Sequence, residues 1–198
     1  MDNNELVYVV KSDDQYVFLR DVVKKEMHLS RALIINLKQQ KKIMVNGAVT
    51  LTNYRLKPGD VVSVDLALDE ESTVEPENIP LDIVYEDQDF LLINKPPRLA
   101  VHPSKGLGSG TLANAVVHYW QAQGRSLRFR PINRLDRDTS GLILIGKSQY
   151  AHQAIAYQQK KGIIHREYQA VVEGVMADDQ GCIDLPIARK DPELRERM

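Results

Sequence analysis

The segment PINRLDRDTSGLILIGKS, residues 131–148, is the stretch that most narrows the fold and the chemistry. Its first half is a polar loop in which Asp136 lies between Arg134 and Arg137. Its second half contains the apolar run Leu142–Ile145, which predicts a strand. Neighbouring cations favour the charged form of a carboxyl group, so this loop could present a carboxylate beside a phosphodiester backbone. Taken alone, an aspartate between two arginines is more often a structural ion pair.

The segments around this loop predict helices and strands that alternate irregularly. Upstream, LDIVYEDQDFLLINKP predicts two strands, Ile83–Glu86 and Phe90–Asn94, joined by a polar turn. Thr111 is a predicted N-cap of a helix to about Gln123, and a further helix is expected from about Ser148 to Lys161. The run IIHREYQAVVEG, residues 163–174, alternates in the manner of a strand. Because the regular crossover spacing of a Rossmann domain is missing, we predict an α+β fold.

The first 68 residues predict a compact module of helices and strands. Ser30 is a predicted N-cap of a helix whose apolar residues recur at helical spacing. Asn46–Gly47 predicts a tight turn, because both residue types tolerate positive φ. A second turn at residues 58–60 precedes an alternating strand from Val62 to Leu66.

Charge is segregated along the chain, although its total is close to zero. The formal net charge of −1 and the pI near 6.5 argue by themselves against nucleic acid. Residues 20–57 nevertheless carry nine basic side chains against two acidic ones, a net charge of +7. Residues 69–80, DEESTVEPENIP, are acidic, contain two prolines and predict a linker. Two basic clusters favour an RNA partner over simple solvated faces. The second cluster comprises Arg125, Arg128, Arg130, Arg134 and Arg137.

Composition disfavours several classes of protein. No stretch approaches the roughly 20 apolar residues that cross a bilayer, and the first residues lack the features of a signal peptide. We therefore expect a cytoplasmic protein with no membrane partner. The single cysteine, Cys182, excludes an internal disulfide framework, and no Cys or His cluster has the spacing of a zinc site. We expect no metal, no cofactor and a monomeric chain.

Three segments together resemble the RluA-type RNA pseudouridine synthases. NRLDRDTSG, residues 133–141, is similar to the family signature His-Arg-Leu-Asp followed closely by Thr-Ser-Gly. INKPPRLAVHPS, residues 93–104, resembles the Lys-Pro loop that ends in His-Pro. REYQAVVEG, residues 166–174, resembles a family strand of the pattern Lys-x-Tyr-x-Ala-x-Val-x-Gly. The resemblance implies a mixed, largely antiparallel-sheet catalytic domain that isomerises uridine to pseudouridine in RNA.

The same resemblance implies roles for individual residues. Asp136 matches the essential aspartate, and Tyr168 matches the tyrosine that packs against the target uracil. Arg134 matches the arginine that fills the gap left by the flipped nucleotide, as a planar guanidinium can do. Asp136 could attack the anomeric carbon as a nucleophile or act as a base on the ribose, and neither route needs a cofactor. The positions implied to contact RNA or to shape the pocket are Lys95, His102 and Arg137.

The first module resembles the S4-like RNA-binding domain, which is named after a ribosomal protein. The resemblance covers about Tyr16–Leu66 and depends on SRALIINLKQQKKIMVNG followed by LKPGDVVSV. In that family, two helices and the adjoining turn present basic residues to RNA. The corresponding residues of this chain are Lys24, Arg31, Lys38, Lys41, Lys42 and Arg55.

These resemblances predict three parts along the chain. We expect an S4-like RNA-binding domain over residues 1–68, an acidic linker over 69–80 and the N-terminal portion of a catalytic domain over 81–198. Asn133 and Arg166 stand where the family usually has histidine and lysine. The family normally continues to a segment like GRTHQIRVH, so we expect a catalytic domain that is incomplete at its C-terminus.

Alternatives to an active synthase remain open at this point. The expected substrate is structured RNA, ribosomal RNA being favoured over transfer RNA. A noncatalytic RNA-binding protein, or an inactive fragment of such an enzyme, is the main alternative. A glycoside hydrolase that uses Asp136 together with Asp138 is weaker, because aromatic segments for stacking sugars are lacking.

Overall fold

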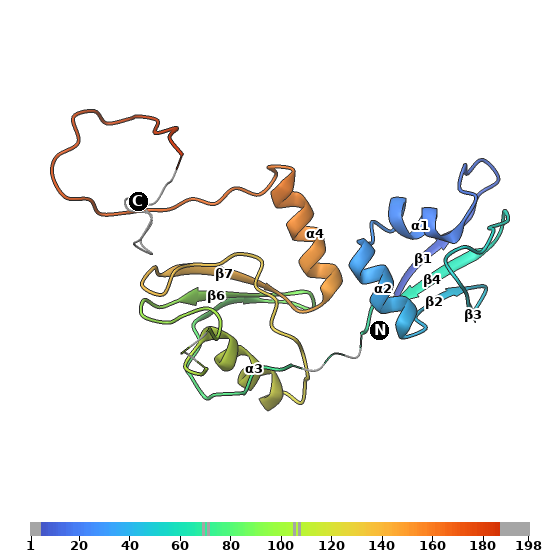
Figure 1. Ribbon diagram of the computed structural model, residues 1–198, viewed down its shortest axis with the longest axis horizontal. Coiled ribbons are helices and arrows are strands. Elements are labelled where there is room, and N and C mark those ends of the chain that lie inside the picture. Colours follow the sequence, from blue (N-terminus) through green and yellow to red (C-terminus); the bar gives the residue numbers. More distant parts are fainter. Residues whose placement is uncertain (1–4, 69, 71, 105, 107, 187–198) are drawn as a thin grey trace. The chain divides into compact units, whose positions relative to one another are not determined.

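The computed structural model describes residues 5–68, 70, 72–104, 106 and 108–186, and it is shown in Figure 1. The chain forms two units, residues 1–165 and residues 166–198. All helices and strands of the described residues belong to the first unit. Residues 166–186 of the second unit form neither a helix nor a strand. None of the helices in the described ranges is long and apolar enough to cross a membrane.

The first part of the chain forms a four-stranded sheet with two short helices. The strand order is β1-β4-β2-β3, and every neighbouring pair is antiparallel. Apolar residues of both helices and of the central strands bury one another in a single core. Strand β1 was not predicted, although its alternating burial is typical of an edge strand. The elements are β1 (Glu5–Val9), α1 (Leu19–Lys25), α2 (Arg31–Gln39), β2 (Ile43–Val45), β3 (Ala48–Val49) and β4 (Val61–Asp65).

Local sequence signals explain where these elements begin and turn. The Ser30 hydroxyl accepts a hydrogen bond from the backbone N–H of Leu33 at 3.2 Å, so the predicted N-cap of α2 is confirmed. Asn46 and Gly47 have φ values of 53° and 77°, and they form the predicted turn between β2 and β3. Positive φ at both positions gives the twist that a tight hairpin requires.

The second part of the chain forms a three-stranded antiparallel sheet in the order β5-β6-β7. Figure 1 shows α3 against one face of this sheet, and Trp120 of α3 is fully buried in the shared core. The predicted caps at Thr111 and Ser148 are confirmed. The elements are β5 (Ile83–Glu86), β6 (Phe90–Lys95), α3 (Leu112–Ala122), β7 (Gly141–Gly146) and α4 (Gln149–Lys160).

The register of β6 and β7 brings two distant loops together. Lys95, the last residue of β6, lies opposite Gly141, the first residue of β7. The loop that follows β6 and the loop that precedes β7 therefore leave the sheet at the same end. These two loops carry the Lys-Pro segment and the Asp136 segment singled out in the sequence.

The strand predicted over residues 163–174 is absent, and that prediction is wrong. Those residues pair with no other described segment. The physical reason is that a strand needs a partner to satisfy its backbone N–H and C=O groups, whatever its own alternation suggests.

The acidic linker is only partly a free connector. Residues 69 and 71 lie outside the described part, but Glu75 and Glu77 are fixed to α3 through their backbones. The Asn114 side chain donates to the Glu75 carbonyl at 2.8 Å, and the Glu77 N–H donates to the Asn114 carbonyl at 3.1 Å. The Glu77 carboxylate also accepts from the Gly110 N–H at 2.6 Å. The second half of the linker therefore packs as part of the sheet domain.

Gly146 tests how closely β7 packs against α4. A Cβ added at Gly146 would lie 2.9 Å from the His152 nitrogen and 3.0 Å from its Cα, both backbone atoms that cannot move independently. We expect Gly146→Ala to lower the free energy of unfolding by about 1–3 kcal/mol because of this overpacking.

Urea unfolding followed by circular dichroism measures the effect. Gly108→Ala is the matched control, because a Cβ at Gly108 meets nothing within 4 Å. Equal stability of the two variants would contradict the packing.

Candidate active site

The loop before β7 is held along that strand by Asn133. The Asn133 side-chain amide donates to the Leu142 carbonyl at 2.9 Å, and its oxygen accepts from the Leu144 N–H at 2.9 Å. The N–H of Ile132 also donates to the Leu144 carbonyl, at 2.7 Å. An amide side chain offers one donor group and one acceptor, as a backbone unit does. The asparagine that departs from the family signature thus anchors the start of the loop.

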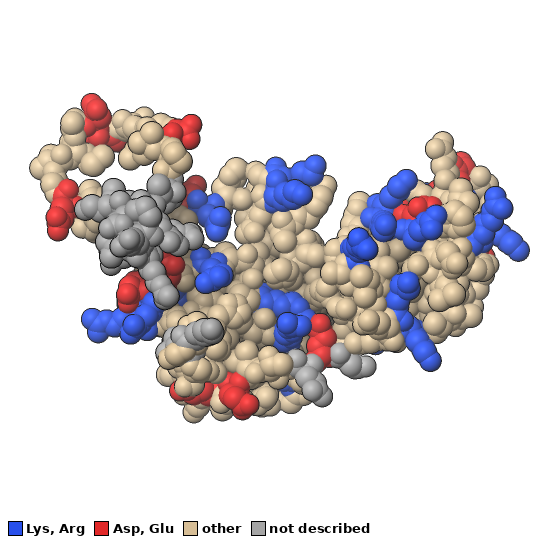
Figure 2. All heavy atoms as spheres, in the orientation of Figure 1, with Lys and Arg blue, Asp and Glu red and all other residues tan. Residues whose placement is uncertain are grey.

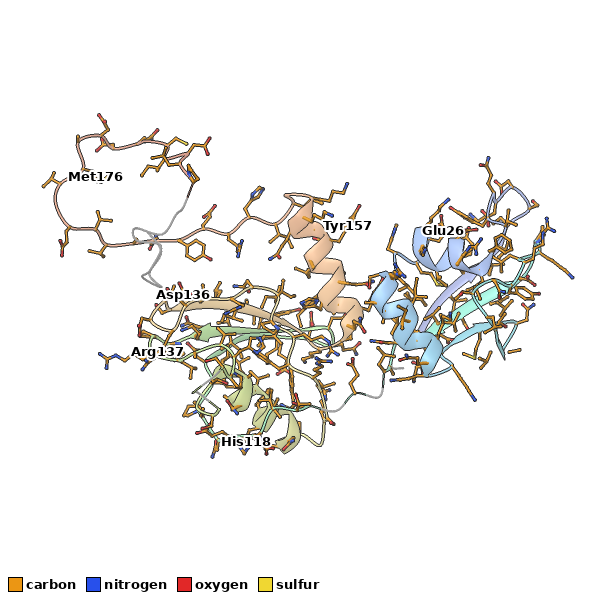
Figure 3. The ribbon with its side chains drawn as sticks, viewed as in Figure 1. Glu26, His118, Asp136, Arg137, Tyr157 and Met176 are labelled. Carbon is orange, nitrogen blue, oxygen red and sulfur yellow. The ribbon has the colours of Figure 1, made fainter. Side chains whose placement is uncertain are left out.

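Asp136 lies in an exposed turn just after this anchor. Its backbone carbonyl accepts from the Thr139 N–H at 3.2 Å, which closes a four-residue turn. Among the described residues, no basic nitrogen lies within 4.0 Å of the Asp136 carboxylate. The structural ion pair with Arg134 or Arg137, which the sequence left open, is therefore not formed. Figure 3 shows Asp136 at the end of the sheet with Arg137 pointing outward.

Lys95 fixes this turn from inside the domain. Its side chain is fully buried, with 0% exposed. The Nζ atom donates to the carbonyls of Pro96 at 2.8 Å, Leu99 at 2.9 Å and Arg137 at 3.1 Å. An ammonium group has three donors, so all of them are satisfied. The bond to Arg137 joins the loop after β6 to the turn that carries Asp136.

The burial of Lys95 changes its expected role. Burial lowers the pKa of Lys95, and the nearby Asp138 carboxylate opposes that shift. Three carbonyl acceptors can be served only by the protonated form. Because the Lys95 ammonium is buried and its donors are occupied by the protein, its surroundings favour the shaping of the loop over a direct contact with RNA.

His102 and Arg134 lie together beside the same loop. Both line an open hollow of about 390 Å³. The rings of His102 and Phe129 pack in a T-shaped arrangement, with centroids 5.0 Å apart and planes at 75°. Burial, followed by the positive charge of Arg134, lowers the pKa of His102. Arg134 itself is exposed.

The predicted basic residues of the first module differ in their availability. Lys42 is tied to Asp65 by an ion pair of 2.7 Å, so its cation is already partnered. Figure 2 shows Lys and Arg side chains spread over the visible surface of this module. Of the residues predicted to contact RNA, the exposed ones are Lys24, Arg31, Lys38, Lys41 and Arg55.

Tyr168 lies in the second unit, with 62% of its surface exposed. Its predicted contact with the target base stays a prediction. Within the described ranges, no group of three or more His, Cys, Asp or Glu side chains is placed to hold a metal ion.

Sequence reasoning missed three contributors to the site region. Asn133 was noted only as a departure from the family, and His152 and Glu70 were given no role. His152 lines the same hollow as His102, while Glu70 reaches it from the linker and pairs with Arg130. The Ser-capped helix could have suggested that His152 faces β7, but no local pattern connects Glu70 to Arg130 across 60 residues.

Known proteins match most of this chain. Residues 89–198 match the family model described as RNA pseudouridylate synthase. The chain is 37% identical over 185 residues to "Uncharacterized RNA pseudouridine synthase YhcT" of Bacillus subtilis (strain 168), which covers 93% of the chain and 61% of that protein. It is 40% identical over 160 residues to "Uncharacterized RNA pseudouridine synthase YlyB" of the same strain, covering 79% of the chain and 52% of that protein.

A further relative has a more specific name. The chain is 38% identical over 159 residues to "Ribosomal large subunit pseudouridine synthase D" of Escherichia coli (strain K12). That alignment covers 80% of the chain and 48% of the relative. The chain thus spans between about half and three fifths of the length of these curated relatives.

Replacing Lys95 by methionine tests the internal anchor. Lys95→Met keeps the length of the side chain but leaves the carbonyls of Pro96, Leu99 and Arg137 without their buried donor. We expect the free energy of unfolding to fall by about 3 kcal/mol, because unsatisfied buried polar groups are costly. We also expect faster hydrogen exchange of the Thr139 amide, measured by mass spectrometry or NMR.

Lys57→Met is the control, since Lys57 is an exposed lysine. An unchanged exchange rate at Thr139 in the Lys95 variant would show that the anchor does not hold the turn.

Proposed function

Because the chain belongs to the RNA pseudouridylate synthase family, we propose that it acts in converting uridines of structured RNA to pseudouridine, with Asp136 as the reacting carboxylate. The observation that carries this proposal is the environment of Asp136. Its side chain is exposed and has no described ion-pair partner, while the turn beneath it is fastened by a buried lysine. A carboxylate held this way can approach a ribose without first breaking a salt bridge.

The chemistry of the proposed reaction is an isomerisation. The bond between the ribose anomeric carbon and the uracil ring nitrogen breaks, the base turns, and a ring carbon bonds to the ribose. The proton lost from that carbon is balanced by the proton gained at the nitrogen, so nothing is oxidised or reduced. Asp136 acts either as a nucleophile at the anomeric carbon or as a base on the ribose. Both routes use one accessible carboxylate.

Access to the target base requires extrusion from the RNA stack. A nucleotide inside a helix cannot present its anomeric carbon to a side chain, so the enzyme flips it out. Arg134 is exposed two residues before Asp136, and its planar guanidinium is suited to filling the vacated space. Tyr168 is proposed to supply the stacking face for the extruded uracil.

The first module is proposed to hold the RNA as an S4-like RNA-binding domain over residues 1–68. The five exposed residues predicted to contact RNA there, together with the outward-pointing Arg137, provide positive charge for the phosphate backbone. Such contacts supply affinity and position rather than sequence choice. We propose ribosomal RNA as the substrate ahead of transfer RNA, in line with the name of the Escherichia coli relative.

Replacing the carboxylate is the decisive test. We expect Asp136→Asn to lower pseudouridine formation by at least about 100-fold, because the amide can act neither as a nucleophile nor as a base. Pseudouridine is mapped by chemical labelling and reverse transcription, in ribosomal RNA incubated with the wild-type chain and with the variant. RNA binding is measured in parallel and is expected to stay unchanged.

The control is Asp13→Asn, which removes an exposed carboxylate elsewhere. Full modification by the Asp136 variant of an active form would leave a noncatalytic RNA-binding role. Release of free base or sugar would instead indicate glycoside hydrolysis.

A further inference from the structure

The hollow beside the Asp136 loop is lined by more basic side chains than the proposed reaction requires. Its lining includes five basic or protonatable side chains, which we call the basic hollow. Its volume is about 390 Å³, and Glu70 is the one acidic residue among its described lining residues. The five side chains are His102, Arg128, Arg130, Arg134 and His152.

The arginines of the basic hollow are unequally satisfied. Arg130 is largely buried, pairs with the Glu70 carboxylate and donates to the Arg128 carbonyl at 3.1 Å. Arg128 and Arg134 are exposed, and no described carboxylate lies within 4.0 Å of either guanidinium. Two cations without an internal counter-ion therefore face a hollow that already contains a third.

The pKa values of the two histidines are also affected by the arginines of the hollow. Burial lowers the pKa of His102 first, and the charge of Arg134 lowers it further. Burial also lowers the pKa of His152, with the charge of Arg130 acting in the same direction against a backbone hydrogen bond. In both rings burial is the larger cause of the lowered pKa, and the charge of the neighbouring arginine acts in the same direction.

We propose that the basic hollow binds a backbone phosphate of the RNA close to the target uridine, with Arg128 as its direct ligand. This phosphate site rests on the function proposed above. It adds the group of the RNA, a backbone phosphate, that the protein binds beside the reacting carboxylate. Arg134 and Asp136 are two residues apart, so their Cα atoms are separated by at most about 7 Å. A phosphate bound in the hollow that Arg134 lines therefore belongs to the target nucleotide or to a neighbour of it.

Guanidinium groups suit this role because they bind phosphate oxygens through paired N–H donors. The contact fixes the position of the RNA strand and carries no sequence information. The RNA strand that enters the hollow is thus set in register with Asp136, whichever bases it carries.

Glu70 gives the basic hollow an internal competitor. Its carboxylate occupies Arg130 with the same sign of charge that an entering phosphate brings. Glu70 therefore weakens phosphate binding by repulsion while it keeps Arg130 in place. Removing its charge is expected to strengthen RNA binding, which is the opposite of what loss of a purely structural ion pair would do.

Equilibrium binding without turnover tests the proposal separately from catalysis. The probe is a fluorescently labelled RNA stem–loop with a single loop uridine, titrated with the chain at several potassium chloride concentrations. We expect Arg128→Gln to weaken binding about tenfold at low salt and to reduce the slope of log K against log salt by about 0.7–0.9. We expect Glu70→Gln to tighten binding several-fold.

Matched controls separate a local contact from net charge. Lys160→Gln removes one exposed positive charge outside both the hollow and the first module, and Glu75→Gln removes one exposed negative charge from the same linker. If the Arg128 and Glu70 variants bind no differently from these two controls, the basic hollow is not a phosphate site. Thermal unfolding of each variant confirms that it is folded, and Arg128 is exposed, so its replacement leaves the core intact.

A neutral phosphate locates the contact on the RNA. Methylphosphonate substitution next to the loop uridine is expected to weaken binding by the wild-type chain and to have little further effect on the Arg128→Gln variant. Additive losses would place Arg128 on another phosphate and overturn the proposed position. Because no step requires pseudouridine formation, loss of these effects and loss of the isomerase activity are distinguishable.

Discussion

The buried ammonium of Lys95 is the interaction on which the candidate site depends. It collects carbonyls from the loop after β6 and from the turn before β7, two segments that are 42 residues apart at their contact. Taking a cation out of water costs free energy, which is offset here only because every donor finds an acceptor. Since the three hydrogen bonds of the ammonium point in three different directions, they fix the orientation of the Asp136 turn from the buried side. The Asp136 carboxylate therefore stays in solvent.

The basic residues of the chain fall into two groups that differ in their partners. Lys42, Lys147 and Arg130 are partly or largely buried and each is paired with a carboxylate, so they belong to the folded scaffold. The exposed lysines and arginines of the first module, together with Arg128 and Arg134, have no described carboxylate partner. The net charge of the chain is nearly zero, but the paired cations are neutralised by their carboxylates. The unpaired cations form a positive surface, and this is where RNA is proposed to bind.

Local signals in the sequence predicted much of the fold, because caps, turns and apolar periods depend on neighbouring residues. Ser30, Thr111, Ser148 and Asn46–Gly47 all act as their residue types suggest. The burial of Lys95 could not be predicted in this way, since it follows from the register of β6 against β7. The strand expected after residue 163 failed for a related reason, because strand pairing is a property of two segments. The exposure of Asp136 agrees with the sequence, whereas the counter-ion at Arg130 depends on a contact that only the folded chain creates.

The attachment of Asn133 and its neighbours along β7 has a consequence for self-association. Residues 130–133 occupy hydrogen-bonding groups from Leu142 to Gly146 on the outer side of the sheet, through both backbone and amide bonds. A bare outer strand is a template on which another molecule can add a strand and begin to aggregate. By covering β7 with an irregular segment, the chain blocks that template without extending the sheet, so the loop that carries Asp136 also protects this strand against pairing with another molecule.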